Sequence, residues 1–453
     1  MLPDSVLSRT GRALLVALPL VWAPLAGQQS DPLGPLVAEA LRNNSLMDAA
    51  RLSEEKAAAG VREARALMLP SLGLESRYSR QNGSLNIGDF VNPAYQALNQ
   101  LTGTNRFPTD LDLTLPLQHD SRLRLSQPLV NFGIWANRSV AGHRYEAQRF
   151  QRYAFARRLA ADVQAAYLAA ASARSAVEIR ESTLRLVQES ERVAERLLEA
   201  GRATPDAVLR ARADRSEAEQ QLMEARDDLA AATRSLNQLA GRPLDAPLEE
   251  IADSLLIHPI PLERDAAVAY ALDHREELAA LEAGAGAADA GARVARSAFL
   301  PSVSVALDVG YQGRNISFTR DNDYIIGSVV VSWNLFNGGG DLARLDAARA
   351  EGERLRAERR DAGQKVRLDV LRAWDAATVA RAAIVTADDR LSAADRAYEL
   401  VRRRYDEGLA PQVELIDART ALTSARLNRS VTLYRYAARL VDLERAAALR
   451  EIN

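Results

Sequence analysis

The chain has 453 residues, a formal net charge of -2, 47% hydrophobic residues and 26% charged residues. This balance excludes an intrinsically disordered chain and offers no basic excess that would indicate nucleic-acid binding. Because the chain has no cysteine, disulfides, thiol catalysis, cysteine-ligated metals and a lipidated N-terminal cysteine are also excluded.

The N-terminal stretch has the pattern of a secretory signal peptide. Two arginines precede an apolar run, Ala13 to Leu25, that ends in small residues. Two prolines interrupt this run, and it is too short to span a bilayer comfortably. We predict a signal peptide at residues 1–27, with an N-terminal membrane anchor as the alternative. Any later contact with a bilayer is expected through strands or an amphipathic surface.

The first half of the mature chain, residues 28–241, is predicted to begin with a helix that ends at Pro70. An alternation of apolar and polar residues directly after it indicates a strand. A polar loop over about 80–110 and a second alternating segment from Leu111 follow. We therefore predict a β-hairpin over residues 72–128.

Two helices complete this first half. A long helix is predicted over residues 131–200, where Gly201 stops it, and a shorter helix over residues 205–241. Several prolines then mark an irregular linker over residues 242–262.

The second half, residues 263–451, repeats the same order. It has a helix, a hairpin over 302–336, a long helix over 339–407 and a last helix over 411–451. The long helix carries apolar and alanine residues at alternating steps of four and three from Val366 to Tyr405. This period is typical of a long coiled-coil helix.

Equivalent motifs indicate an internal duplication. Leu69-Pro70-Ser71 pairs with Leu300-Pro301-Ser302, and Leu129-Val130-Asn131 pairs with Leu335-Phe336-Asn337. The repeat is too long for a solenoid and indicates a duplicated domain.

The predicted helix lengths suit a rod or a tube. Each long helix of about 70 residues reaches roughly 100 Å, and each shorter helix has about half that length. We expect the helix at 205–241 to stack end to end on 264–299, and the helix at 33–69 to stack on 411–450, so that each pair matches one long helix.

The strands add a second constraint. Strands of about 10 residues suit a tilted bilayer crossing, but an open four-stranded sheet leaves backbone groups unbonded in hydrocarbon. Three copies would close a twelve-stranded barrel. We therefore predict a mainly α fold with long coiled-coil helices and four strands per chain. The alternative is two soluble hairpins packed on a helical body.

Together these features resemble the TolC-like outer-membrane efflux proteins. The local likeness lies in Ala64 to Leu72, in Trp333 to Gly339, and in Tyr405 to Gly408 followed by Val413 to Ala418. The resemblance implies a homotrimer with one twelve-stranded transmembrane β-barrel in the outer membrane and a periplasmic α-barrel. It also implies passive export, energised by an inner-membrane transporter through a periplasmic adaptor (membrane fusion protein).

The resemblance places an acidic aperture at Glu414 and Asp417, which lie three apart on one helical face. Carboxylates from three copies would bind cations or repel anionic solutes. The alternative is a solvated helix start, where the helix dipole favours acidic residues. Tyr405 is a candidate gate latch, or a core residue. Some family members hold the entrance closed with a basic residue, and the corresponding place here is Ala410.

The two helix turns expected at the periplasmic end are candidate adaptor-docking tips. Their residues are Gly201, Thr204, Pro205, Gly408 and Pro411. Ordinary helix capping explains the same residue types without a partner.

Aromatic residues near the strand ends are candidates for a girdle at the membrane interface. They are Phe132, Trp135, Trp333 and Phe336. Packing at the joint between strand and helix is the alternative.

No catalytic constellation, metal site or cofactor motif stands out, so we do not expect an enzyme. The four histidines are scattered, and no GxxxxGK[ST] phosphate loop occurs. An outer-membrane exit duct of an efflux or type I secretion system is the leading hypothesis. A periplasmic adaptor or coiled-coil scaffold is the alternative, although its single helical hairpin and β-domains match the sequence less well.

Overall fold

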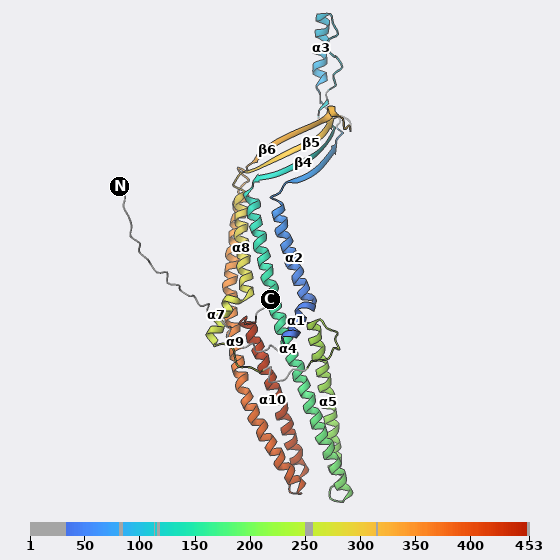
Figure 1. Cartoon of the computed structure of the whole chain (residues 1–453), viewed down its shortest axis with the longest axis vertical. Helices are drawn as coiled ribbons and strands as arrows, with labels where there is room; N and C mark the ends of the chain where they lie inside the picture. The colour runs from blue at the N-terminus through green and yellow to red at the C-terminus, as the bar shows by residue number, and fades with distance from the viewer. Residues whose placement is uncertain are drawn as a thin grey trace, which may run out of the picture.

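The computed structural model is an elongated molecule in which a bundle of long helices carries a β-sheet at one end (Figure 1). A further helix, α3, stands beyond the sheet. The structure describes residues 33–80, 85–112, 114–115, 118–249, 257–313 and 316–450. The predicted signal peptide lies outside these residues.

Two helices run through the full height of the bundle: α4 (Phe132–Glu199) with 68 residues and α9 (Gly340–Asp406) with 67 residues. Asn131 begins α4, because its side-chain oxygen accepts a hydrogen bond of 3.1 Å from the backbone N–H of Ile134. The heptad pattern predicted for α9 is confirmed by its buried positions, which include Val366, Val370, Ala377, Ala380, Ala387 and Tyr398. Among the helices that the structure describes, none is both long and apolar enough to cross a membrane.

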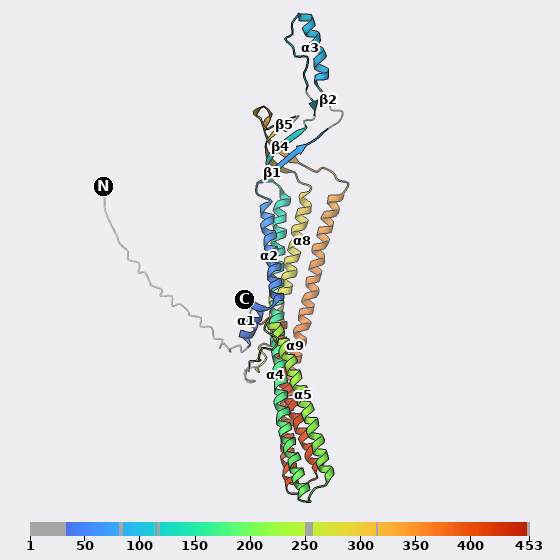
Figure 2. The same cartoon turned by 90° about the vertical axis from the view of Figure 1, so that its right-hand side faces the viewer.

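Shorter helices line α4 and α9 in two tiers (Figures 1 and 2). The upper tier, next to the sheet, holds α2 (Ser45–Ala66) and α8 (Glu276–Ser297). The lower tier holds α5 (Pro205–Ala240) and α10 (Gln412–Ala446). Two short helices lie where the tiers meet: α1 (Gly34–Asn43) and α7 (Arg264–His274).

The tiers stack in a different order from the predicted one. The side chain of Asn44 donates a hydrogen bond of 2.9 Å to the carbonyl oxygen of Leu239, so α5 continues α2 and not α8. Arg275, between α7 and α8, donates one of 3.1 Å to the carbonyl oxygen of Ala446 at the end of α10. The expected stacking of the half-length helices is therefore wrong, because α7 packs on α9 and α8 packs between α4 and α9, which places α8 in line with α10 and not with α5.

The hydrophobic core is concentrated where the tiers meet. One buried cluster joins α1, α4, α5 and α10 and includes Tyr167, Leu236 and Val441. A second joins α7, α8, α9 and the end of α10 and includes Val370 and Leu443. Apolar burial of this kind stabilises the contact between the tiers, which α4 and α9 also connect covalently.

The sheet has four antiparallel strands in the order β1-β4-β5-β6. They are β1 (Ser71–Tyr78), β4 (His119–Val130), β5 (Ser302–Gly313) and β6 (Asp323–Ser332). β1 and β4 form the first hairpin, β5 and β6 form the second, and β4 pairs with β5 between them. The 3-10 turn η1 (Arg320–Asn322) precedes β6. Because side chains alternate along each strand, the two faces of the sheet differ in chemistry.

The connection between β1 and β4 corrects one part of the prediction. The stretch expected to be a polar loop contains helix α3 (Gly88–Thr102), and the strand expected from Leu111 begins only at His119. Two short strands, β2 (Leu85–Asn86) and β3 (Thr114–Leu115), pair with each other between the main sheet and α3.

Two asparagines of α3 explain this difference. The side chain of Asn92 donates a hydrogen bond of 2.8 Å to the carbonyl oxygen of Leu111 and accepts one of 2.9 Å from its N–H. Asn99 makes the same pair of bonds with Phe107. The backbone of the returning segment is thus bonded to helix side chains, which replace the strand partner that the alternating leucines suggested.

Candidate functional site

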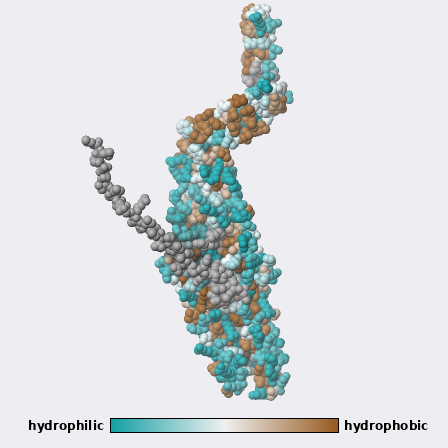
Figure 3. Space-filling model, in the orientation of Figure 1, coloured by the Kyte–Doolittle hydropathy of each residue, from teal (hydrophilic) through white to brown (hydrophobic). Residues whose placement is uncertain are grey.

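One face of the sheet is apolar and uncovered. Leu74 on β1 exposes 79% of its surface, and Val329 on β6 exposes 71%. The helical bundle lies beyond the ends of the strands (Figure 1), and apolar surface covers the sheet in the space-filling view (Figure 3). The exposed apolar residues of this face are Leu72, Leu74, Leu123, Leu125, Leu307, Val309, Ile325, Val329 and Val331. A patch of this extent marks a surface that another apolar phase or partner covers.

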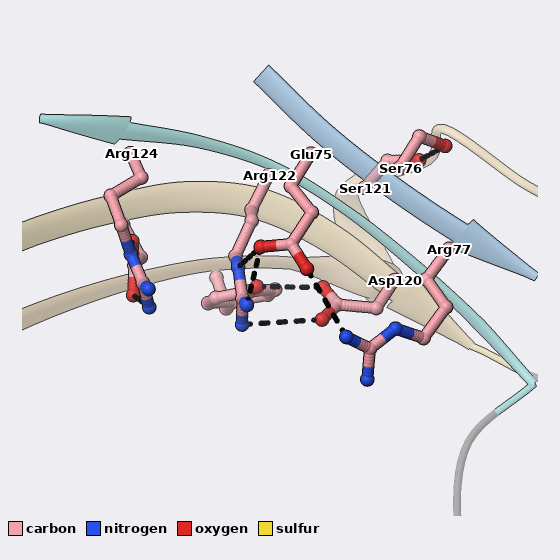
Figure 4. Close-up of polar contacts among 9 residues, drawn as sticks. Glu75, Ser76, Arg77, Asp120, Ser121, Arg122 and Arg124 are labelled. Atoms are coloured by element: carbon pink, nitrogen blue, oxygen red, sulfur yellow. Dashed lines mark hydrogen bonds and ion pairs between the residues drawn. The ribbon is translucent and has the colours of Figure 1, made fainter. Parts of the chain in front are cut away.

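The opposite face carries a group of charged residues that we call the charged belt. Figure 4 labels Glu75, Arg77, Asp120, Arg122 and Arg124 of this belt, and Asp308 lies opposite Arg124 in the sheet. Arg124 donates two hydrogen bonds of 2.7 Å to Asp308 on β5. Arg122 donates one of 2.7 Å to Glu75 on β1. Tyr324 on β6 donates one of 2.8 Å to Asp120.

The charged belt is electrically balanced, because its three guanidinium groups face three carboxylates. Arg77 lies 3.2 Å from Glu75, and Arg122 lies 3.4 Å from Asp120. The two-point contact between Arg124 and Asp308 has the geometry of the strongest such pairs. The sheet therefore has one apolar face suited to hydrocarbon and one mainly polar face, which also carries Ile326 and Val330 of β6.

Both outer strands of the described sheet have an open edge. β1 pairs with β4 on one side, β6 pairs with β5 on one side, and all residues of β1 are exposed. The N–H and C=O groups along such edges are available to another strand. A sheet with an apolar face and two open edges is incomplete in a single copy.

The turns between α4 and α5 and between α9 and α10 lie together at the lower end (Figures 1 and 2). Gly201 and Gly408 end the long helices in the left-handed region that favours glycine. Thr204 directly precedes α5, which begins at Pro205, and Pro411 directly precedes α10. The hydroxyl of Thr204 lowers the pKa of Asp206 by hydrogen bonding to its carboxylate.

The predicted aperture residues lie next to these turns. Glu414 is in the first turn of α10, 3.5 Å from the guanidinium of Arg404 on α9. Asp417 is exposed one turn further along. Tyr405 is half-buried against a cluster that includes Leu415. Burial raises the pKa of Tyr405, and the charge of Asp406 adds to this shift.

Two arginines near the tips do not emerge from sequence reasoning. Arg404 bridges the α9–α10 hairpin, whereas the position matched to the family's basic residue, Ala410, is buried. Arg419 on α10 contacts Asp214 on α5 at 2.8 Å. A run of arginines before the turn, residues 402–404, is the one local signal for Arg404. The partner of Arg419 is distant in sequence and left no local signal.

The predicted girdle residues lie at the junction of sheet and helices. Phe132 and Trp135 pack edge to face with ring centroids 5.3 Å apart. The indole N–H of Trp333 donates a hydrogen bond of 3.1 Å to the carbonyl oxygen of Phe299. Phe336 is 84% exposed. Three of the four thus have a local partner, while Phe336 projects from the surface.

Comparison with known proteins identifies the family of this chain. The sequence model of the outer membrane efflux protein family matches residues 36–242 and, separately, residues 268–449. The chain belongs to the outer membrane efflux protein family. The two matches fall one in each half of the chain.

Individual proteins that are similar to this efflux-family chain support the same assignment. It is 27% identical over 352 residues to the alkaline protease secretion protein AprF of Pseudomonas aeruginosa, covering 76% of this chain and 72% of AprF. Its fold resembles the CmeC outer membrane channel of Campylobacter jejuni, with a TM-score of 0.76, 16% identity and coverage of 98% and 94% of the two chains. It also resembles the open state of the MtrE outer membrane channel of Neisseria gonorrhoeae, with a TM-score of 0.73, 22% identity and coverage of 92% and 89%.

The expected fold class and function are confirmed. The chain is a mainly helical, TolC-like outer-membrane exit duct protein whose long helices lie in the periplasm. The family consists of channels and not of enzymes. Within the described residues, no group of histidine, aspartate or glutamate residues is arranged to hold a metal ion. Membership of this family replaces the alternative of an adaptor or scaffold.

Proposed function

We propose that three copies of this chain close a twelve-stranded barrel in the outer membrane. The observation that carries this proposal is the four-stranded sheet with one apolar face, one charged face and two open edges. Joining β6 of each copy to β1 of the next bonds every open edge. The apolar face then meets lipid, and the charged belt lines the water-filled lumen.

The long helices of three copies form the wall of a periplasmic α-barrel. In each copy the two tiers both contain four helix segments, because α4 and α9 pass through both. Each tier of the trimer therefore contributes twelve segments to the wall. The duct opens at the helix turns, where a periplasmic adaptor docks on the tips and connects the duct to an inner-membrane transporter.

Transport through this duct is passive, and the transporter supplies the energy. In the parts that the structure describes, no group of histidine or acidic residues is arranged to hold a metal ion, and the relative AprF is named for the secretion of an alkaline protease. Glu414 and Asp417 form the aperture at the lower end, and Tyr405 supports the hairpin that carries them. Residues 1–27 are removed as a signal peptide during export.

Electron microscopy and light scattering of the detergent-extracted protein test the proposal. We expect a hollow particle with threefold symmetry, a mass of three chains and a stepwise conductance in planar bilayers. Extraction should require detergent, and the trimer should migrate differently on a gel before and after heating. A monomer that dissolves without detergent and shows no hollow body would contradict the proposal.

A further inference from the structure

The two hairpins of the sheet are equivalent, yet their second strands end at different points. Each first strand follows the motif Leu-Pro-Ser, so Ser71 corresponds to Ser302. Ser71 lies opposite Ser126 in the first hairpin, and Ser302 lies opposite Ser332 in the second. Ser126 therefore corresponds to Ser332. β6 ends at Ser332, whereas β4 continues past Ser126 to Val130.

The extension of β4 has an identifiable cause. Residues 127–130 lie beyond the start of β1, and β5 alone holds them in the sheet. Gln127 lies opposite Val305, and Val130 lies opposite Val303. A strand thus continues through this stretch when a neighbouring hairpin offers its first strand as a partner.

The corresponding stretch after β6 is Trp333 to Phe336. In one copy β6 has β5 on one side and an open edge on the other, so no neighbouring first strand holds these residues. Leu335 and Phe336 are left 78% and 84% exposed. On β1, the other open edge, Leu72 is also exposed, at 66%. The residues after β6 lack a neighbouring first strand, and β1 lacks a second neighbouring strand, so each segment can serve as the partner of the other.

We propose that β6 of each copy continues through Phe336 and pairs with β1 of the next copy in the register that β4 makes with β5. This inference rests on the trimer proposed above. The direction is already correct, because β4 and β6 run toward the helices and β1 and β5 run away from them, so the new pair is antiparallel.

The duplication fixes the residue pairs. Leu123 lies opposite Val309 in the β4–β5 ladder, which corresponds to Val329 opposite Tyr78 of the next copy. The other pairs follow when each β4 residue is replaced by its equivalent on β6 and each β5 residue by its equivalent on β1. They give Val331 opposite Ser76, Trp333 opposite Leu74, and Phe336 opposite Leu72, with the irregularity of β4 near Pro128 repeated near Asn334.

Any register that differs by an even number of residues also keeps the apolar face continuous, and the hairpins themselves supply one such competitor. If the strand ends were flush, as in each hairpin, Ser332 would face Ser71 of the next copy and Val331 would face Leu72. A slip of a single residue is excluded, because it would turn the apolar face toward the lumen. The flush register leaves Trp333 to Phe336 without a partner, whereas the proposed register covers them with β1.

Cysteine cross-linking separates the two registers, because the chain has no cysteine of its own. One variant carries Val331→Cys with Ser76→Cys, and the matched variant carries Val331→Cys with Leu72→Cys. Residues directly opposite in an antiparallel pair have Cα atoms about 4.5–5.5 Å apart, which a disulfide spans. The mismatched pair is four residues out of register, about 14 Å along the strand.

We expect the Ser76 variant to run as a covalent trimer on a non-reducing denaturing gel after oxidation, and as a monomer after reduction. The Leu72 variant and the Val331→Cys single variant should stay monomeric on the same gel. Light scattering of each variant before denaturation reports whether the trimer has formed.

The other outcomes overturn one proposal or the other. Cross-linking of the Leu72 variant alone would establish the flush register. Cross-linking of both variants, or of neither, in particles that scatter light as trimers would show that β6 and β1 do not meet in the proposed register. Particles that are monomeric in every variant would instead overturn the trimer itself.

Discussion

The guanidinium of Arg419 on α10 donates a hydrogen bond of 2.8 Å to the carboxylate of Asp214 on α5. The arginine side chain is 8% exposed and the aspartate side chain is 23% exposed. This contact joins the second helix of one hairpin to the second helix of the other. A further link lies closer to the tips, where the side chain of Gln412 donates to the carbonyl oxygen of Ala207 at 3.3 Å.

Replacing this arginine should loosen the two hairpins from each other. Arg419→Ala leaves the carboxylate of Asp214 partly buried without its partner, which costs about 3 kcal/mol. We expect a roughly hundredfold loss of amide protection in α5 and α10 near Asp214 and Arg419, measured by hydrogen exchange. The exposed Arg402 on α9 supplies the control Arg402→Ala, which should leave protection unchanged. Equal protection in all three proteins would mean that the pair does not hold the hairpins together.

The charged belt should set the ion selectivity of the barrel. Asp308→Ala removes one carboxylate and leaves Arg124 uncompensated, which adds three positive charges to the lumen of a trimer. We expect the reversal potential in a salt gradient to move toward anion selectivity. Arg124→Ala should move it toward cations.

The double variant Arg124→Ala/Asp308→Ala restores the charge balance and serves as the control. Its reversal potential should return close to that of the unmodified protein. If Asp308→Ala and the double variant give the same potential, the belt does not face the conducting path.

The aperture assignment predicts an effect on cation block. Glu414→Ala/Asp417→Ala removes two carboxylates per chain from the lower end, so divalent cations should block the single-channel current less strongly. Planar bilayer recordings measure this directly. Glu224 and Asp227 have the same spacing and are exposed on α5, so their double alanine variant is the matched control. Unaltered block in the Glu414/Asp417 variant would remove the assignment.

The raised pKa of Tyr405 predicts a dependence of hairpin stability on alkaline pH. Burial favours the neutral phenol, so its contribution to stability is fully present below the ordinary tyrosine pKa of about 10. That contribution is lost as the pH rises through the raised value in the folded protein. The melting temperature should therefore fall more between pH 8 and 11 in the unmodified protein than in Tyr405→Phe. Parallel curves would show that the pKa of this phenol is the same in the folded and unfolded states.

Local periodicity predicts the long helices well and their partners poorly. The steps of four and three that end at Tyr405 are contained in one segment, so the sequence alone reveals them. The break at Asn44 is not predicted, because the residue is neither glycine nor proline and the helical pattern continues on both sides. Its extended backbone ends α1, and its side-chain oxygen accepts from the N–H of Leu46 at 2.9 Å to begin α2.

In the candidate site, too, features within one segment can be predicted from the sequence, whereas partners distant in sequence cannot. Alternating arginines and leucines predict that the strand containing Arg122 and Arg124 has one polar face. The pairing of Arg124 with Asp308 depends on the register between the two halves, across 184 positions of sequence. No pattern within either segment specifies that register. The same reason hides the contact between Arg419 and Asp214, which the sequence separates by 205 positions.

The division into two tiers has a mechanical consequence. At the level of Asn44 and Arg275, α4 and α9 are the described helices that continue unbroken, while their neighbours meet end to end through side-chain contacts. A twist applied at the tips is therefore transmitted toward the sheet through the two continuous helices, α4 and α9. The neighbouring helices are held at their abutting ends by these hydrogen bonds and by the buried clusters between the tiers, so a rotation of the lower wall also strains those contacts.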